Sequence, residues 1–215
     1  HSIIKNKTFR LGFAAIVWLA VWKFASWMIG SQVLLASPWQ TARTWFGLLF
    51  QAEFWQTLLS SLARILIGFC GAMTAGVLLA VLASMSEWIK TLLHPMMILI
   101  KSTPVASFII IVLLWFGSIW LASIISFLMV LPVIYTNVLQ GIETTDRKLL
   151  EMAQVFKLSA NKRISAIYLT HVMPFMLSAL SVSSGLAWKS GVAAEVIGLP
   201  NQSIGEKLYQ AKLFL

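Results

Sequence analysis

Charged residues are scarce in this chain, and acidic ones are the scarcest. Only 11% of the 215 residues are charged, seven of them are acidic, and Asp146 is the single aspartate. Because a soluble globular domain carries about 25% charged residues, the composition argues against one. The acidic residues form no pair placed for acid–base chemistry, and no Ser/His/Asp set stands out. The sequence therefore predicts no catalytic centre.

Cysteine is nearly missing as well. Cys70 is the only one and lies inside an apolar run, so no disulfide framework or multi-cysteine metal site is available. We expect a buried, inert thiol there. His94 and His171 have no second metal ligand at a useful spacing. We therefore predict no metal site and interpret both histidines as ordinary residues near helix ends.

A nucleotide-binding loop is also lacking. The nearest approach is Gly71–Gly76, which has two glycines but continues with Val77 and Leu78, where a P-loop has Lys and Ser or Thr. This stretch also lies inside an apolar run, which is typical of a membrane helix. Energy for any transport must then come from another chain or from an ion gradient.

Long hydrophobic runs are what the sequence does contain. Hydrophobic residues make up 59% of the chain and gather in stretches long enough to cross about 30 Å of hydrocarbon. We expect an all-α, polytopic transmembrane helical bundle that forms one domain over residues 1–215. A sixth span is expected to begin at Leu213 and to be cut off at the C-terminus. The five visible spans are Leu11–Ile29, Leu58–Ala83, Leu92–Phe116, Ile119–Leu139 and Ile164–Trp188.

Four less apolar segments separate these spans. We expect a helix lying in the membrane interface at Trp39–Gln56, a polar turn at Ser84–Thr91, a charged loop at 141–163 (the 141–163 loop) and a polar connection at Lys189–Lys212. The second span carries small residues at helical spacing, which let another helix approach closely. These residues are Gly68, Gly71, Ala72, Ala75 and Gly76.

The distribution of basic residues predicts the orientation. The net charge is +9, but the basic residues form no tract or stripe of the kind that binds nucleic acid, so no nucleic-acid partner is expected. With a cytoplasmic N-terminus, nine basic residues face the cytoplasm and three face outward, as the positive-inside bias requires. The inside set is Lys5, Lys7, Arg10, Lys90, Arg147, Lys148, Lys157, Lys162 and Arg163, and the outside set is Arg43, Lys207 and Lys212.

The 141–163 loop has the pattern of a short amphipathic helix followed by a turn and a second helix. Asp146 or Thr145 is suited to cap its start, and Ser159 to cap the helix that continues into the fifth span. Leu149, Leu150, Ala153 and Phe156 recur at three-to-four spacing. Such a helix can dock on a partner, pack on its own bundle or lie on lipid headgroups.

Several motifs resemble binding-protein-dependent ABC importer permeases. Glu151-Met-Ala153, Lys157-Leu-Ser159-Ala, Ile167-Tyr-Leu169 and Pro174 resemble the EAA loop of that family. Two longer stretches are similar to the branch that handles sulfonates, taurine, nitrate and thiamin precursors. They are KSTPVASFIIIVLLWFG (Lys101–Gly117) and GLAWKSGVAAEVIGLPNQSIGEKL (Gly185–Leu208).

The chain departs from the family pattern at three positions. Met152 replaces the second alanine, Lys157 replaces the usual glycine, and Thr170 replaces the proline. The loss of the glycine matters most, because glycine permits a left-handed turn that costs lysine about 1 kcal/mol or more. We therefore expect a wider turn, or continuous helix, at Lys157.

The resemblance implies a multi-pass permease of the bacterial inner membrane that is not itself an enzyme and holds no cofactor. It would receive a small solute, such as a sulfonate-like anion, from an extracytoplasmic binding protein. It would pair with a second permease copy, as a homodimer, and dock the 141–163 loop as a coupling loop on cytoplasmic ATPase subunits that bind ATP and Mg²⁺. Glu151, Ala153, Lys157 and Ser159 would then form the ATPase contact.

Four charged residues within the spans, at their edges or just beyond the fifth span are candidates for function, because an ionisable group at membrane depth is expensive. Arg64 and Lys101 either face a cavity that attracts an anionic substrate, or extend toward the interface or backbone carbonyls. Lys189 and Glu195 either pair to shape an extracytoplasmic gate or form a solvated pair.

A gradient-driven secondary transporter or channel is the alternative to an ABC permease. That class tends to show internal repeats and intramembrane acids for ion coupling. The chain has no convincing repeat and no carboxylate clearly at the membrane midplane, so the residues favour the ABC permease.

Overall fold

The structure, a computed structural model, describes residues 2–31 and 34–213, and the statements below concern that part of the chain. All its regular elements are helices, and the described residues contain no strand. The predicted all-α class is confirmed. The described residues up to Gln56 and those from Thr57 onward separate into two compact units.

The first unit contains two helices and the start of a third. They are α1 (Ser2–Ile29), α2 (Pro38–Leu48) and the first residues of α3 (Ala52–Met85). Residues 9–29 are long and apolar enough to cross a membrane, and none of that stretch is buried by the rest of the chain. The interface helix predicted over Trp39–Gln56 is shorter than expected, because α2 ends at Leu48 and α3 has begun by Ala52.

The start of α2 is defined by its first side chains. Ser37 Oγ accepts a hydrogen bond from Gln40 N (3.4 Å), and Gln40 Oε1 accepts one from Ser37 N (3.1 Å). This reciprocal capping box satisfies backbone donors that a helix start otherwise leaves free. Pro38 at the first helical position adds a backbone angle suited to a helix start. The loop before α2 therefore ends at a well-defined residue.

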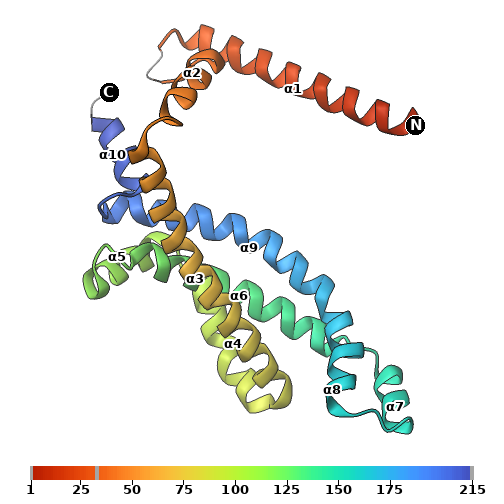
Figure 1. Cartoon of the computed structure of the whole chain (residues 1–215). Helices are drawn as coiled ribbons and strands as arrows, with labels where there is room; N and C mark the ends of the chain where they lie inside the picture. Colours follow the sequence, from red (N-terminus) through yellow and green to blue (C-terminus); the bar gives the residue numbers. More distant parts are fainter. Residues whose placement is uncertain (1, 32–33, 214–215) are drawn as a thin grey trace. The chain divides into compact units, whose positions relative to one another are not determined.

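The second unit contains the remaining helices (Figure 1). Besides α3 they are α4 (Glu87–Ser102), α5 (Val105–Phe116), α6 (Leu121–Glu143), α7 (Arg147–Val155), α8 (Ala160–Arg163), the π-helix η1 (Ile164–Tyr168), α9 (Leu169–Gly198) and α10 (Ile204–Leu213). Among described residues, four helices are long and apolar enough to cross a membrane, or five if α4 and α5 together form one span. The polytopic helical architecture is therefore confirmed at this level.

The predicted third span is broken. α4 and α5 meet at an angle of 103°, with Thr103 and Pro104 between them. Proline cannot donate the next helical hydrogen bond, and it disfavours helical backbone at the residue before it. At about 1.5 Å per residue, neither half alone covers the roughly 30 Å of a hydrocarbon core. The break therefore changes the course of the chain at membrane depth.

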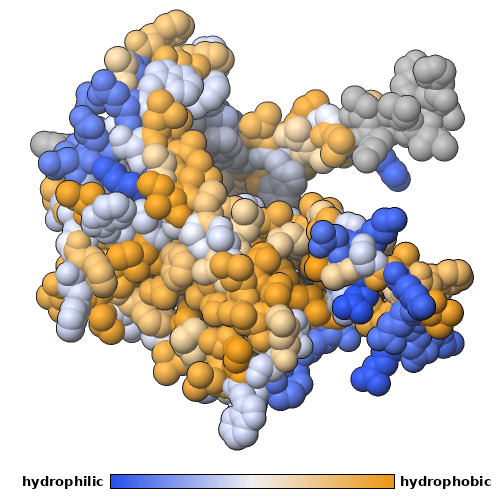
Figure 2. Space-filling model, turned by 60° about the horizontal axis from the view of Figure 1, so that its bottom comes forward, coloured by the Kyte–Doolittle hydropathy of each residue, from blue (hydrophilic) through white to orange (hydrophobic). Residues whose placement is uncertain are grey.

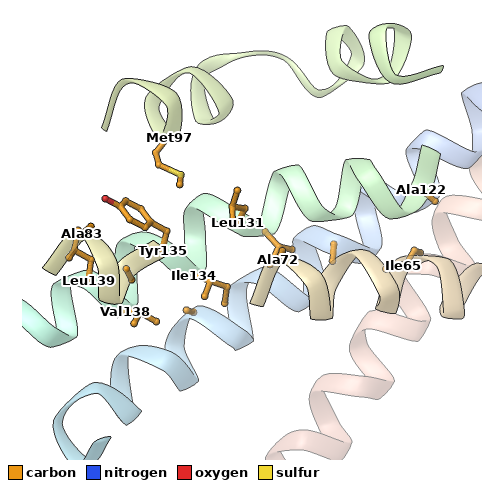
Figure 3. Packing of buried hydrophobic residues seen from close by; sticks show 14 residues of the cluster. Ile65, Ala72, Ala83, Met97, Ala122, Leu131, Ile134, Tyr135, Val138 and Leu139 are labelled. Carbon is orange, nitrogen blue, oxygen red and sulfur yellow. The ribbon is translucent and has the colours of Figure 1, made fainter. Parts of the chain in front are cut away.

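Small residues on α3 bring it against α6. Gly68, Ala72, Gly76 and Ala80 are buried at four-residue spacing, and their neighbours on α3, α4 and α6 form the main core cluster (Figure 3). A Cβ atom on Gly68 would lie 2.0 Å from Ser123 O, so only glycine allows this approach. The predicted small-residue face is confirmed at Gly68, Ala72 and Gly76, whereas Gly71 lies on the exposed side.

α9 runs along α6 in the opposite direction. A Cβ atom on Gly141 would lie 3.2 Å from Val172 Cα, and one on Gly191 would lie 2.8 Å from Ser126 Oγ. The prediction of a polar connection over Lys189–Lys212 is wrong, because α9 continues to Gly198 and α10 begins at Ile204. Its small residues, such as Ala194, are buried on the bundle, and this packing favours helix despite the nearby charges.

Two smaller expectations need correction, and a third is not tested. The polar turn at Ser84–Thr91 shrinks to Ser86, where α3 gives way to α4. Cys70 is exposed on α3 and not buried, because it faces away from the side that packs on α6. The sixth span predicted from Leu213 would continue into Phe214 and Leu215, which lie outside the described residues.

The second unit has two chemically distinct ends. α3 and α6 run in the same direction, since Gly68 lies against Ser123 and Gly76 against Ile134. The Ser86 turn and the 141–163 loop therefore lie at the same end of the second unit. The surface in view is mostly hydrophobic, and hydrophilic residues gather where α7 and α8 project and also at the opposite side of the view (Figure 2). An apolar belt with polar ends is the expected surface of a membrane bundle.

Candidate functional site

An ion pair marks the base of the 141–163 loop. Lys90 Nζ lies 2.6 Å from Glu143 Oε1 and 3.9 Å from Glu87 Oε1. Because Lys90 is in the first turn of α4 and Glu143 ends α6, the pair joins these two helices where the loop leaves the bundle. Thr145 is buried just beyond, and its Oγ1 donates to Gly141 O (3.1 Å). These contacts define the point from which the loop projects.

α7 has the amphipathic form that its sequence predicts. Asp146 is its N-cap, and Asp146 Oδ1 accepts a hydrogen bond from Lys148 N (2.9 Å). Ala153 is 1% exposed, so it faces the rest of the chain. Leu149 and Phe156, expected on the same apolar face, are exposed. The apolar face is therefore only partly covered by the chain's own bundle.

The turn after α7 is tight, which contradicts the expected widening at Lys157. Lys157 has φ +49°, in the left-handed region. Leu158 N donates to Ala153 O (2.9 Å) and Lys157 N donates to Gln154 O (3.0 Å), the paired bonds of a Schellman motif. The two hydrogen bonds hold the glycine-type turn, so lysine adopts a conformation that costs about 1 kcal/mol or more relative to glycine.

The outward surface of the loop mixes apolar and charged side chains. Val155 is 79% exposed and Phe156 is 71% exposed. Glu151 and Lys157 are also exposed. Ser159 occupies the N-cap position of α8 as predicted, but its side chain makes no capping hydrogen bond. Exposed aromatic and aliphatic groups beside charges are typical of a surface that binds another protein.

A buried carboxylate dominates the opposite end of the second unit. Glu195 on α9 has 0% exposure. Its Oε1 lies 3.4 Å from Arg64 Nη1, and its Oε2 accepts a hydrogen bond from Ser61 Oγ (2.7 Å). A carboxylate survives such burial only when charge and hydrogen bonds compensate for lost hydration. Both partners lie on α3, so Glu195 joins α9 to α3.

The same carboxylate helps to hold the start of α10. Gly205 N lies 3.4 Å from Glu195 Oε2, and Ile204 N donates to Ser61 Oγ (2.9 Å). Arg64 Nη2 donates to Asn201 O (3.0 Å), in the turn between α9 and α10. A Cβ atom on Gly205 would lie 2.2 Å from Glu195 C, so the close approach requires glycine there. Three helices therefore meet at one charged centre.

The sequence pointed to Arg64 and Glu195 separately but did not pair them. Lys189, expected to partner Glu195, is exposed on α9, while the ion-pair partner of Glu195 is Arg64. The expected Lys189–Glu195 pair, whether as a gate or as a solvated pair, is therefore wrong. Ser61, Asn201 and Gly205 were missed altogether. Ser61 and Asn201 bond to residues more than a hundred positions away, which leaves no local pattern in one sequence. The contact of Gly205 with Glu195 depends on the packing of α10 against α9.

Lys101 lies in the last turn of α4, at the break before Pro104. Its Nζ bonds to Thr136 Oγ1 on α6 (3.3 Å), and its side chain is exposed in the isolated chain. Thr136 Oγ1 also donates to Pro132 O (2.7 Å). A lysine exposed at membrane depth is costly against lipid, so such residues face a water-filled cavity or a protein partner.

The histidines offer no metal site in the part of the chain that the structure describes. No group of three or more His, Cys, Asp or Glu side chains is placed to hold an ion there. His171 Nε2 lies 3.4 Å from Thr144 Oγ1, and its ring packs near Phe175. His94 is exposed on α4. The glycine-containing stretch Gly71–Gly76 lies inside α3.

Comparison with known proteins identifies similar sequences over most of the chain. Residues 72–213 match the family model described as "Binding-protein-dependent transport system inner membrane component". The chain is 32% identical, over 203 residues, to the putative aliphatic sulfonates transport permease protein SsuC of Escherichia coli (strain K12). That alignment covers 92% of this chain and 75% of the relative.

Other similar proteins are named for different small molecules. The putative aliphatic sulfonates transport permease protein SsuC of Bacillus subtilis (strain 168) is 27% identical over 91% of this chain and 71% of its own length. The taurine transport system permease protein TauC of Escherichia coli (strain K12) is 24% identical over 95% of this chain and 78% of its own length. The family model and these relatives agree on the kind of protein.

Proposed function

Because the chain belongs to the family of binding-protein-dependent transport system inner membrane components, we propose a specific role for each of its parts. The chain is a permease subunit of an ABC importer and a multi-pass protein of the inner membrane. Its relatives are transport permeases and not enzymes. The proposals concern which residues contact partners, which face the solute, and which way the chain is oriented.

The 141–163 loop is the proposed contact with the ATPase. The observation that carries this proposal is the exposed apolar and charged surface of α7, which projects from a base held by the Lys90–Glu143 pair. Glu151, Lys157 and Ser159 face outward, and Ala153 packs α7 onto the bundle. ATP and Mg²⁺ would bind the ATPase and not this chain. Closure of two ATPase subunits would move α7, and α6 and α9 would transmit that movement.

Two further partners and an orientation complete the proposal. The N-terminus and the 141–163 loop lie in the cytoplasm, as the basic residues of that loop favour. A binding protein docks at the opposite end of the second unit, and a second copy of the permease completes the pathway. The single domain covers residues 1–215, and a sixth span begins at its C-terminal end.

The Arg64–Glu195 centre is the proposed extracytoplasmic gate. It ties α3, α9 and the start of α10 together, so opening this end requires these contacts to change as a unit. Lys189 lies on α9, the helix that carries Glu195, and is exposed. This position suits contact with the binding protein or the solute. Differential affinity of the partners for open and closed states would drive the change.

Lys101 is the proposed contact for an anionic solute. The similar permeases are named for aliphatic sulfonates, taurine, nitrate and bicarbonate, most of which carry negative charge. Lys101 places an exposed ammonium group, bonded to Thr136 Oγ1, at the break between α4 and α5. A small anion of the sulfonate type is therefore the proposed substrate class.

Substitution of Glu151 tests the ATPase contact. The affinity-tagged chain is expressed with its ATPase, and the amount of ATPase recovered per permease is measured. Glu151→Lys is expected to reduce recovery about tenfold, since it reverses an exposed charge at the contact, while gel filtration shows a folded permease. Glu151→Gln, of similar size, is the matched control and should lose less. ATP-independent uptake by the purified chain alone would contradict the whole assignment.

A further inference from the structure

The turn after α7 carries a lysine where the backbone favours glycine. Lys157 occupies the left-handed position of the Schellman motif (φ +49°), with both backbone hydrogen bonds formed. Glycine would make the same turn without steric strain. A residue held in an unfavourable conformation at an exposed site suggests that its side chain serves another purpose.

Among the described residues, the Lys157 side chain has no ion-pair partner. Lys157 is exposed, and the ion pairs found among described residues, which involve Arg64 and Lys90, do not include it. Asp146, an acid of the same loop, is engaged as the cap of α7 through Lys148 N. The Lys157 ammonium group therefore remains available to a partner.

The surroundings indicate the chemistry of that partner. Residues 146–163 contain five basic and two acidic side chains, and Val155 and Phe156 next to Lys157 are largely exposed. An apolar surface with positive charge fits an apolar groove bordered by carboxylates. Lipid headgroups also attract positive charge, but they require no particular backbone conformation, whereas the left-handed turn fixes the direction in which the Lys157 side chain leaves the backbone.

We infer that Lys157 pairs with a carboxylate on the ATPase subunit and thereby selects an ATPase whose docking groove is acidic at that point. This inference rests on the proposed function of the 141–163 loop and adds the chemistry of the partner's surface. It makes Lys157 a specificity residue for assembly, with no direct contact to the transported solute.

Lys157→Gly removes the ammonium group and also relieves the left-handed strain. A loss of binding in this variant therefore comes from the missing ammonium group and not from a strained backbone. The full chain, in nanodiscs of zwitterionic lipid, is titrated with the purified ATPase that co-purifies with it, at about 50 mM and about 500 mM salt. At low salt, Lys157→Gly and Lys157→Asn are expected to raise Kd about tenfold, and Lys157→Arg to leave it within about twofold. High salt should shrink these differences.

Lys162→Asn is the matched control, since Lys162 is an exposed lysine on the neighbouring α8. It is expected to change Kd by less than about threefold. Equal losses from both lysines would overturn the inference, because they would indicate diffuse attraction. A loss seen only in discs that contain anionic lipid would also overturn it and assign the ammonium group to a lipid phosphate.

The two proposals fail differently. A wild-type chain that binds no ATPase overturns the proposed function of the loop, and the inference falls with it. Wild-type binding that Lys157→Gly leaves unchanged overturns the inference alone.

Discussion

Glu195 and Lys157 are each held in a position that is unfavourable when considered alone. Glu195 is a carboxylate with no exposed surface, and Lys157 has a left-handed backbone. The first is stabilised by Arg64, Ser61 and the start of α10, and the second by the two hydrogen bonds of its turn. At the residue scale, the neighbours and not the residue type determine what is tolerated.

Removal of the buried Glu195 carboxylate should lower the stability of the chain. Glu195→Ala leaves Arg64 without its ion partner and Ser61 and Gly205 N without an acceptor. We expect the free energy of unfolding to fall by roughly 2–4 kcal/mol, somewhat below a fully buried pair because Arg64 keeps some exposure. Detergent-driven unfolding of the purified chain measures this change.

Two further variants check that the loss comes from the charge centre. Glu195→Gln keeps one of the two acceptor oxygens and should lose about half as much. The double variant Arg64→Met, Glu195→Met should lose less than the sum of its single changes, because no charge is left unpaired. A fall of less than about 0.5 kcal/mol in Glu195→Ala would show that the pair does not hold this end together.

Lys101 should affect the solute and not the assembly. Lys101→Met removes the ammonium group at the α4–α5 break and is expected to raise KM for uptake of an anion about tenfold, the loss of one charge-assisted hydrogen bond. Uptake of labelled taurine, nitrate and an alkanesulfonate into cells with the complete transporter measures this. Lys101→Arg keeps the charge and should retain uptake. A fall in kcat with KM unchanged would instead indicate a role in coupling.

Helix packing in this chain depends on which glycines face a neighbour. Gly68 and Gly71 are three residues apart on α3, yet only Gly68 lies against the backbone of α6. The apolar pattern of α3 alone does not distinguish them, since both lie in the same apolar run. At the element scale, the rotation of α3 about its own axis decides which of the two glycines faces α6 and allows close approach.

A pair of alanine substitutions separates these roles. Gly68→Ala would place a methyl group 2.0 Å from Ser123 O, so α3 must move, and we expect a loss of roughly 1–3 kcal/mol in unfolding free energy. Gly71→Ala is the matched control, because its methyl would meet Phe127 Cδ2 at 3.5 Å, an ordinary contact. It should be neutral or stabilise by up to about 1 kcal/mol through helix propensity. Equal losses would contradict the observed α3–α6 packing.

The orientation of the whole molecule is tested by chemical labelling. In a chain with Cys70→Ala, single cysteines replace exposed Gln154 on α7 or exposed Asn201 in the α9–α10 turn. A membrane-impermeant maleimide applied to intact spheroplasts is expected to label the cysteine at 201, and the one at 154 only after permeabilisation. The reverse pattern would place the 141–163 loop outside and would remove the basis for ATPase coupling.

For the molecule as a whole, the sequence by itself determined that the chain lies in a lipid bilayer, that its fold class is all-α, and which loop is most suited to a partner. Apolar runs longer than a bilayer core need helices whatever their neighbours are, because backbone groups in hydrocarbon must bond internally. The cap at Asp146 is equally local, since it depends on a side chain and a backbone group two residues apart. Such short-range physics can be predicted from one sequence.

Only the tertiary structure decided the rest. It paired Glu195 with Arg64, continued α9 through a stretch that looked like a polar connection, and bent the third span by 103°. It also kept a left-handed turn at Lys157 where a wider one was expected. Each outcome reflects packing or hydrogen bonds whose energy outweighs a local preference, and distant packing partners leave no periodic mark in the sequence.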